Sequence, residues 1–325
     1  MPSVSQERST PNLLQRADSA CPIQEEAGDI HVLRATSMQC PVCSGASSFA
    51  FRKLAEDYFR CHCGFVFIWP RPGEQYLQDR YRQHGEEYWS NERVLKFTFS
   101  PSKSRREIRF LRRFSSGGKL LDIGCSTGSF VRAALDAGFD AEGVDISSPA
   151  IACGKKLGLP LRCLDVLNDP LPDKYDIVSM WATLEHLPDP TRHLKRAQEL
   201  LRPGGLLLVS VPNFAGVTQK LIGKWDRYVG AGHLNYFTPR VLRFTLETCA
   251  MRYRAATTYG FNPIVIAKDF CNRGRRELAV SDLCGDINIT LRVKESPVIH
   301  LQGIFEGWLN IASLGDVVAM CASNG

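Results

Sequence analysis

The chain has 325 residues, of which 44% are hydrophobic and 23% are charged, with a formal net charge of +6. This composition excludes a chain that is disordered throughout, and it suffices to bury the cores of one large and one small domain. The longest apolar runs, such as 206–211, are far shorter than the roughly 20 residues of a membrane-spanning helix, and nothing near Met1 resembles a signal peptide. We therefore expect a cytoplasmic protein without membrane contact. The mild positive charge permits an anionic partner without requiring one.

Changes in composition divide the chain into four segments. The first is polar, contains prolines and predicts a disordered tail, whereas the second has short aromatic runs between cysteines and is too small for a core of its own. The third is polar and helical, and a glycine pair separates it from a large domain with two insertions. The expected bounds are a tail at 1–37, a zinc-ribbon-like module at 38–73, a helical linker at 74–116, and a large domain at 117–325 with insertions at 213–237 and 260–314.

The twelve cysteines are spread along a chain without an export signal, so we expect most of them to be reduced thiols. Four of them have metal-ligand spacing, because Cys40-Pro-Val-Cys43 and Cys61-His-Cys63 are separated by seventeen residues. The second pair is one residue tighter than the usual C-x-x-C, which leaves His62 as an alternative ligand. The spacing favours a structural zinc ion held by all four cysteines, and a closed site of this kind performs no chemistry.

Strand-like and helix-like segments alternate after the glycine pair, which is typical of a parallel sheet covered on both faces. The expected fold is therefore α/β, with a doubly wound, Rossmann-like, mostly parallel sheet. We expect a turn at 203–205 immediately before the fifth strand. The expected strands are 119–124, 140–145, 161–165, 175–181, 206–211, 253–258 and 316–322, and the expected helices are 129–138, 149–158, 190–201 and 239–249.

Ligands of open α/β sheets bind at the carboxyl ends of the strands. The first strand ends in a turn with Gly124 and Gly128, where the backbone can approach a ligand and the next helix directs its amides at an anion. The second strand ends in Asp145, whose carboxylate suits the two hydroxyls of a ribose. Asp165 ends the third strand and can accept from an adenine amino group, and Trp181 ends the fourth with a flat apolar surface. These residues favour an adenosine ligand.

Five segments, in this order and spacing, resemble the class I S-adenosylmethionine-dependent methyltransferases: LLDIGCSTGSF, AEGVDIS, the turn at Asp165, YDIVSMWATLEHLPDP and LLRPGGLLLVSVPN. The resemblance runs from about residue 119 to the C-terminus. It implies that the glycine-rich turn binds the methionine part of the cofactor, the acid of the second strand its ribose, and the acid of the third strand its adenine. Ser126 replaces a glycine that many members have. The implied cofactor residues, with Trp181 added from its strand end, are Asp122, Gly124, Cys125, Ser126, Gly128, Asp145, Ile146, Asp165, Val166 and Trp181.

The segment CGFVFIWPRP resembles the zinc-ribbon leader found before many small-molecule methyltransferases, including enzymes that act on sugars and natural products. The resemblance therefore implies methyl transfer to a small-molecule acceptor, such as a sugar or natural-product intermediate. A hydroxyl acceptor also needs a base or an orienting partner, and two histidines are placed to serve: His233 after the fifth strand, and His186 after the fourth. His193, on an amphipathic helix, is expected to be solvated.

Two alternatives remain at this point. One is an RNA methyltransferase in which the cysteine module and a basic helix around Arg105, Arg106, Arg109, Arg112 and Arg113 hold the nucleic acid. These arginines fall on more than one face of the helix, which favours a solvated surface instead. The other alternative is a catalytically silent scaffold, against which the intact cofactor-facing residues argue.

Overall fold

The structure is a computed structural model, and it describes residues 37–53, 55–73, 98–99, 104–171, 173–230, 232–261, 263–271 and 307–325. The tail predicted at 1–37 and most of the insertion predicted at 260–314 lie outside these residues, as do residues 74–97 of the predicted linker. No helix in the described part of the chain is long and apolar enough to cross a membrane.

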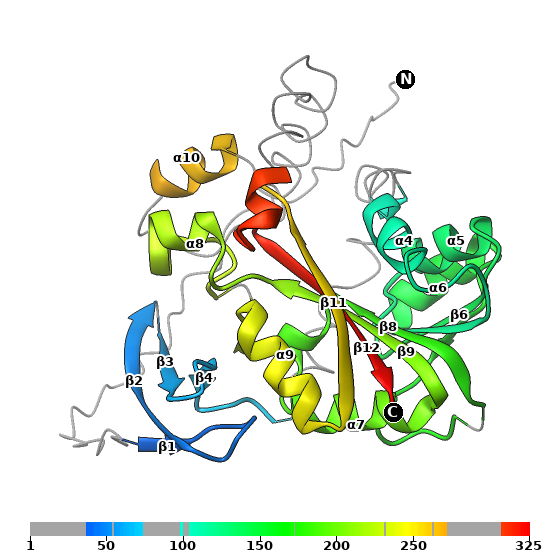
Figure 1. Ribbon diagram of the computed structural model, residues 1–325, viewed down its shortest axis with the longest axis horizontal. Helices are drawn as coiled ribbons and strands as arrows, with labels where there is room; N and C mark the ends of the chain where they lie inside the picture. Colours follow the sequence, from blue (N-terminus) through cyan, green and yellow to red (C-terminus); the bar gives the residue numbers. More distant parts are fainter. Residues whose placement is uncertain are drawn as a thin grey trace, which may run out of the picture. The chain divides into compact units, whose positions relative to one another are not determined.

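A seven-stranded sheet is the centre of the large domain (Figure 1). Its strands are ordered β11-β12-β9-β8-β5-β6-β7, and the pairs from β9 to β7 are all parallel, whereas β12 runs antiparallel to both β9 and β11. The predicted Rossmann-like α/β sheet is confirmed, and the two antiparallel pairings make it mixed. The strands are β5 (Lys119–Ile123), β6 (Asp140–Asp145), β7 (Leu161–Cys163), β8 (Tyr175–Trp181), β9 (Leu201–Pro212), β11 (Met251–Tyr259) and β12 (Val317–Asn324).

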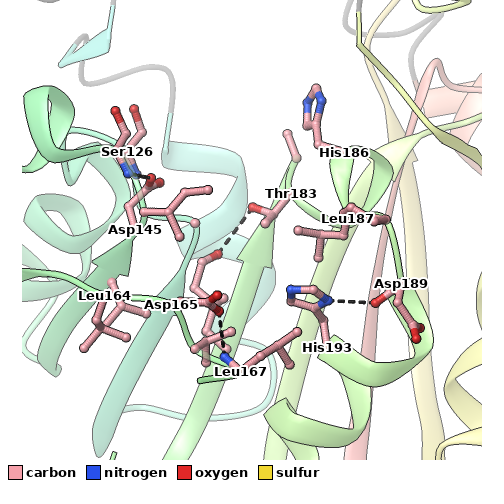
Figure 2. A pocket seen from close by; sticks show the side chains of 18 residues that line it. Ser126, Asp145, Leu164, Asp165, Leu167, Thr183, His186, Leu187, Asp189 and His193 are labelled. Carbon is pink, nitrogen blue, oxygen red and sulfur yellow. Dashed lines mark hydrogen bonds between the residues drawn. The ribbon is translucent and has the colours of Figure 1, made fainter. Parts of the chain in front are cut away.

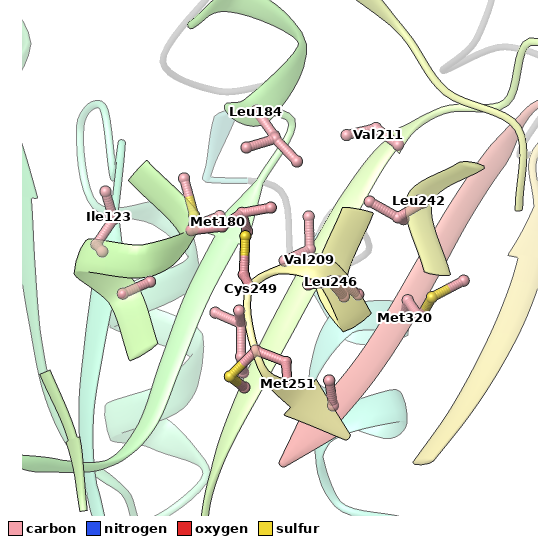
Figure 3. Packing of buried hydrophobic residues seen from close by; sticks show 14 of the residues in the cluster. Ile123, Met180, Leu184, Val209, Val211, Leu242, Leu246, Cys249, Met251 and Met320 are labelled. Atoms are coloured by element: carbon pink, nitrogen blue, oxygen red, sulfur yellow. The ribbon is translucent and has the colours of Figure 1, made fainter. Parts of the chain in front are cut away.

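Helices cover both faces of this sheet because neighbouring residues of its central strands are apolar on both sides. Leu120 and Ile177 pack with the core under α4, α5 and α6, while the adjacent Leu121 and Val178 belong to the core under α7 and α9. Figure 3 shows part of this second core, with Met180 and Leu246 among its members. This double burial is the reason the strands lack a polar alternation. The helices are α4 (Arg105–Leu111), α5 (Ser129–Asp136), α6 (Ser148–Lys156), α7 (Pro190–Leu200), α8 (Val217–Ile222), α9 (Pro239–Thr248) and α10 (Pro263–Cys271), with short 3-10 helices η1 (Leu184–His186) and η2 (Gly223–Trp225).

The turn predicted at 203–205 is part of a strand. Strand β9 begins at Leu201, opposite Tyr175, and the register then moves so that Leu206 pairs with Ile177. The extra residues form a bulge in which Gly204 has a φ of 74°. The glycine and proline signals therefore mark a local irregularity of the strand, not its start.

The cysteine module is part of a second, five-stranded antiparallel sheet, ordered β1-β2-β3-β4-β10. Its last strand comes from the insertion predicted at 213–237, since Asn235 pairs with Phe67 and Tyr236 with Val66. Phe65 also packs against Phe237 with tilted rings whose centroids are 5.1 Å apart, and residues of both sheets belong to one core. The strands are β1 (Ser37–Gln39), β2 (Ala46–Lys53), β3 (Glu56–Cys61), β4 (Val66–Trp69) and β10 (Asn235–Tyr236).

Candidate active site

A cavity of about 290 Å³ lies at the carboxyl ends of β5, β6, β7 and β8 (Figure 2). Two sides face each other across it, with Ser126 and Asp145 on one and the residues that follow β8 on the other. The cavity is lined by Ile123, Gly124, Ser126, Val144, Asp145, Ile146, Ser147, Leu164, Asp165, Val166, Leu167, Ala182, Thr183, His186, Leu187, Pro188, Asp189 and His193.

The glycine-rich turn after β5 forms one edge of this cavity. Gly124 has a φ of 74°, and a Cβ atom there would lie 2.5 Å from Thr183, so only glycine fits. Ser126, which stands where many members of the resembling family have glycine, also adopts a left-handed φ of 52°. Its amide donates to Asp145 Oδ2 at 2.8 Å, which holds the serine in this conformation.

Asp145 ends β6 with its carboxylate in the cavity wall. It accepts from the backbone amides of Ser126 and Ser147, both at 2.8 Å, and burial raises the pKa of Asp145. Two bonds occupy only part of the acceptor capacity of a carboxylate, which has about four lone-pair sites. The same group that fixes the turn can therefore also accept from a ligand hydroxyl.

Asp165 follows β7 and stands in the wall with Val166, between Leu164 and Leu167. Its carboxylate accepts from the Leu167 amide at 2.9 Å and from Asn168 Nδ2 at 2.7 Å, which closes a tight turn. This part of the cavity is therefore apolar apart from one turn acid, an environment that suits an aromatic ring with an amino group.

His193 of α7 was expected to be solvated, and that expectation is wrong. The side chain is 9% exposed and faces the cavity, with its Nδ1 atom 2.7 Å from the Asp189 carbonyl oxygen (Figure 2). Burial lowers the pKa of His193. The amphipathic pattern of α7 places this histidine on the helix face that packs against the core, where a polar ring finds the helix N-terminal carbonyl as its partner.

Four of the predicted cofactor residues stand behind the cavity wall. Asp122 is 3% exposed and accepts from Ser179 Oγ at 2.7 Å, and burial raises its pKa to about 8. Trp181 packs against Phe130 with ring centroids 5.1 Å apart. Cys125 belongs to the core under α5, and Gly128 begins that helix with a φ of 82°. These residues support the glycine-rich turn and do not line the cavity.

The two predicted catalytic histidines lie together. His186 of η1 lines the cavity, and His233, from the predicted insertion at 213–237, packs edge-on against it with ring centroids 4.6 Å apart. Glu185 is adjacent, 1% exposed, and burial raises its pKa to about 8. Sequence reasoning missed Glu185, because only the fold brings the segments after β8 and β9 together.

Arg71 fixes the loop that carries this pair. Its half-buried guanidinium donates to the carbonyl oxygens of Leu187 and Pro188, at 3.2 and 2.6 Å, and to Asn235 Oδ1 at 2.8 Å. The Asn235 amide in turn donates to the carbonyl oxygens of Leu184 and Leu187. One residue after β4 and one in β10 thus hold the cavity wall, which connects the cysteine module to the site.

The four cysteines predicted to bind zinc are brought together. Their sulfur atoms all lie within 4.8 Å of one another, with Cys40 Sγ 3.8 Å from Cys63 Sγ and Cys43 Sγ 3.4 Å from Cys61 Sγ. The Val42 amide lies 3.4 Å from Cys40 Sγ and points at it as a donor. His62, the alternative ligand, is exposed and is not part of this group.

Comparison with known proteins shows which family the chain resembles. A sequence profile described as "Methyltransferase domain" matches residues 97–248. The chain is 27% identical to the ubiquinone biosynthesis O-methyltransferase of Methylococcus capsulatus over 170 residues, which is 50% of this chain and 70% of the relative. It is 30% identical to the enzyme of the same name from Idiomarina loihiensis over 164 residues, 46% of this chain and 67% of the relative.

Solved structures agree at the level of the fold. A SAM-dependent methyltransferase from Thermotoga maritima aligns with a TM-score of 0.50 and 17% identity, covering 77% of this chain and 99% of that one. Magnesium protoporphyrin IX methyltransferase from Synechocystis PCC 6803, solved with bound SAH, aligns with a TM-score of 0.50 and 12% identity over 78% of this chain and 100% of that one. The chain belongs to the S-adenosylmethionine-dependent methyltransferases.

Proposed function

We propose that this enzyme transfers the methyl group of S-adenosylmethionine to a small-molecule acceptor that binds beside His186 and His233. The observation that carries the proposal is the cavity at the ends of four parallel strands, with Asp145 and Asp165 in its wall. Asp145 would bind the ribose hydroxyls and Asp165 the adenine, flanked by Ile146 and Val166. The turn at Gly124 and Ser126 would bind the methionine part.

In this reaction the protein itself performs little covalent chemistry. A lone pair of the acceptor forms the new bond to the methyl carbon, the carbon–sulfur bond breaks, and its electron pair stays on sulfur to give S-adenosylhomocysteine. A hydroxyl acceptor also loses its proton. The enzyme therefore has to align the acceptor with the methyl group, exclude water and provide for that proton.

A hydroxyl acceptor fits both the relatives and the site. The relatives named above are ubiquinone biosynthesis O-methyltransferases, which supports a small molecule methylated on oxygen, and a sugar or natural-product intermediate belongs to the same chemical class. His186 lines the cavity on the side opposite Asp145 (Figure 2), and His233 packs against it. We assign these two histidines to the acceptor, as its general base or as its orienting partner.

The cysteine cluster supports a structural zinc ion held by Cys40, Cys43, Cys61 and Cys63. Zinc–sulfur bonds of about 2.3 Å in a tetrahedron place sulfur atoms roughly 3.8 Å apart, and the distances of 3.4 and 3.8 Å in the cluster fit this geometry. The ion would brace the small sheet from which Arg71 and its partner Asn235 hold the cavity wall. It would take no part in methyl transfer, because all four positions are filled.

The cofactor assignment is tested by replacing Asp145. Asp145→Ala removes hydrogen bonds to a charged acceptor, which are worth about 1.5 to 3 kcal/mol each, so S-adenosylmethionine should bind at least roughly tenfold more weakly. Asp145→Asn retains one acceptor oxygen and should fall in between. Titration calorimetry measures the affinity, and Asp173→Ala, an exposed acid outside the cavity, is the control and should bind normally. Unchanged affinity in a folded Asp145→Ala protein would remove the cofactor assignment.

The RNA alternative receives no support from the arginines in helix α4 and directly after it. Arg112 donates to the Ala137 carbonyl at 2.9 Å, Arg106 lies over the Tyr259 ring, and Arg113 lies over Phe110. These side chains contact the protein itself, so we expect only weak, nonspecific RNA binding near 0.15 M salt. Fluorescence anisotropy with a structured RNA measures it. A tight complex whose affinity falls steeply with salt, and that is lost when Arg109 and Arg112 are neutralised, would favour the RNA alternative.

A further inference from the structure

Three side chains at the acceptor side of the cavity offer metal ligands. A ring nitrogen of His186, a ring nitrogen of His233 and a carboxylate oxygen of Glu185 all lie within 4.8 Å of one another, and His186 Nε2 is 3.9 Å from Glu185 Oε1. Ligand atoms on a zinc-sized ion, at bond lengths of about 2.0 to 2.2 Å, are roughly 3 to 3.5 Å apart. Small side-chain rotations therefore bring the three groups into ligand distance.

The hydrogen bonds of the two imidazoles set the protonation that a metal requires. His186 Nδ1 lies 3.1 Å from the Gly232 carbonyl oxygen, and His233 Nδ1 lies 2.9 Å from the Tyr228 carbonyl oxygen. A carbonyl oxygen only accepts, so each neutral ring holds its proton on Nδ1 and carries its lone pair on Nε2. Metal-binding histidines typically donate their other ring N–H to a carbonyl or carboxylate in this way, which fixes both the tautomer and the ring orientation.

The environment of Glu185 is a second, independent observation that points to a cation in this cluster. Its side chain is buried, and its Oε2 atom has no hydrogen-bond partner among the residues that the structure describes. A buried carboxylate oxygen without a partner is costly, and proteins normally pair such an atom with a cation or a donor. A hydrogen bond from the Leu234 amide to the Glu185 carbonyl, at 2.7 Å, holds the backbone of this residue beside the segment that carries His233.

We infer that Glu185, His186 and His233 bind a divalent transition-metal ion at the acceptor side of the cavity. Two imidazoles and one carboxylate favour Zn²⁺, Co²⁺, Mn²⁺ or Fe²⁺ over Mg²⁺ or Ca²⁺, which prefer oxygen alone. Three protein ligands leave at least one coordination position open. Because His186 lines the cavity, that position is accessible to a ligand that enters it.

The ion would bind the hydroxyl of the acceptor, and the two histidines would orient the acceptor through the ion. This step rests on the proposed function. A bound cation lowers the pKa of a hydroxyl that coordinates it and fixes the position of the oxygen. The site would therefore select acceptors with an oxygen donor, such as a phenol or a sugar hydroxyl, and would reject isosteric acceptors that lack one.

Metal content separates this site from the cysteine cluster. The full chain, stripped with a chelator and dialysed against Zn²⁺, should bind two ions by elemental analysis, one in each site. Glu185→Gln and His233→Asn should each bind only one, with affinity for the second ion reduced by at least roughly 100-fold. Glu247→Gln, which alters an exposed glutamate of α9, should retain two.

Loading the protein with Co²⁺ shows which of the two sites has lost its ion in a variant. The thiolate site gives intense sulfur-to-metal charge-transfer absorption, which should be unchanged in both variants, whereas the weaker visible bands of the nitrogen and oxygen site should disappear. One ion per chain in the wild type, or two in a folded His233→Asn protein, would overturn the inference. Calorimetry with S-adenosylmethionine on the same samples reports on the proposed function separately, because cofactor binding does not require the metal ligands. His233→Asn also retains an amide donor for the Tyr228 carbonyl, so it serves if Glu185→Gln does not fold.

Discussion

Cys40→Ser is expected to remove one zinc ion per chain and to unfold the small sheet. Structural zinc contributes roughly 10 to 16 kcal/mol of apparent binding free energy in small modules, far more than the short strands β1 to β4 gain from their own packing. Elemental analysis measures the metal, and hydrogen exchange measures the backbone protection of residues 37–73. The control is Cys163→Ser, an exposed cysteine outside the cluster, which should change neither quantity.

The effect should extend along defined contacts. Strand β10 pairs with β4, and Arg71 donates to the carbonyls of Leu187 and Pro188, so exchange should also rise in β10 and in the loop after η1. The seven-stranded sheet should stay protected, because most of its core is formed between its own strands and helices. Full zinc content and unchanged protection in Cys40→Ser would show that the four thiols are merely neighbours.

The sequence predicts the sheet and the position of its cavity because both depend on local signals. Apolar runs at 119–123 and 175–181 are buried on both faces, and such runs are typical of parallel strands whatever surrounds them. Asp145 and Asp165 could be placed at the cavity for the same reason, since each directly follows a strand and parallel strands end at one edge. Ser126 was also predictable, because a small residue can adopt the left-handed turn that glycine usually supplies.

The remaining features depend on contacts between distant parts of the chain. Arg71 and Asn235 are 164 residues apart, and nothing in the local pattern around either predicts their hydrogen bond. Likewise, β10 has only two residues, too few to show a strand period, and its pairing exists because β4 offers it an edge. Glu185 was missed because a glutamate on a short turn normally faces solvent, and its burial results from the segment around Leu234 that covers it.

Those long-range contacts also explain which predicted residues stand behind the wall. Asp122 lies one residue before the end of β5, so its side chain points into the protein and bonds Ser179 on the neighbouring β8. Its contribution to the cofactor site is therefore indirect, through the position of the glycine-rich turn. Trp181 ends β8, but its ring turns toward Phe130 of α5. A strand end predicts where a residue lies, while the packing of the next helix decides which way its side chain points.

His233→Asn is expected to lower methyl transfer by roughly 10² to 10⁴-fold, the usual contribution of a group that handles the proton of a reacting hydroxyl. Asparagine retains an amide donor for the Tyr228 carbonyl, and it removes the Nε2 lone pair that would accept the proton or bind the ion. His233→Gln places an amide oxygen near the lost Nε2, so it should recover part of the rate if His233 orients the acceptor or binds the ion, and none if His233 is a base, because an amide does not accept the proton.

Affinity for S-adenosylmethionine should stay within about twofold in both variants, because Asp145 lies on the side of the cavity opposite His186, against which His233 packs. Turnover is measured as the S-adenosylhomocysteine that is released with an acceptor selected from phenols, sugars and amines.

Added Zn²⁺ or Co²⁺ then distinguishes the two possible roles of His233. If His233 is a metal ligand, a saturating concentration of the ion should restore activity to His233→Gln, whose amide oxygen is a weak ligand, and not to His233→Asn. If it is a general base, the ion should restore neither. Full activity of His233→Asn with the true acceptor would exclude both roles and would leave His186 as the residue that acts on the acceptor.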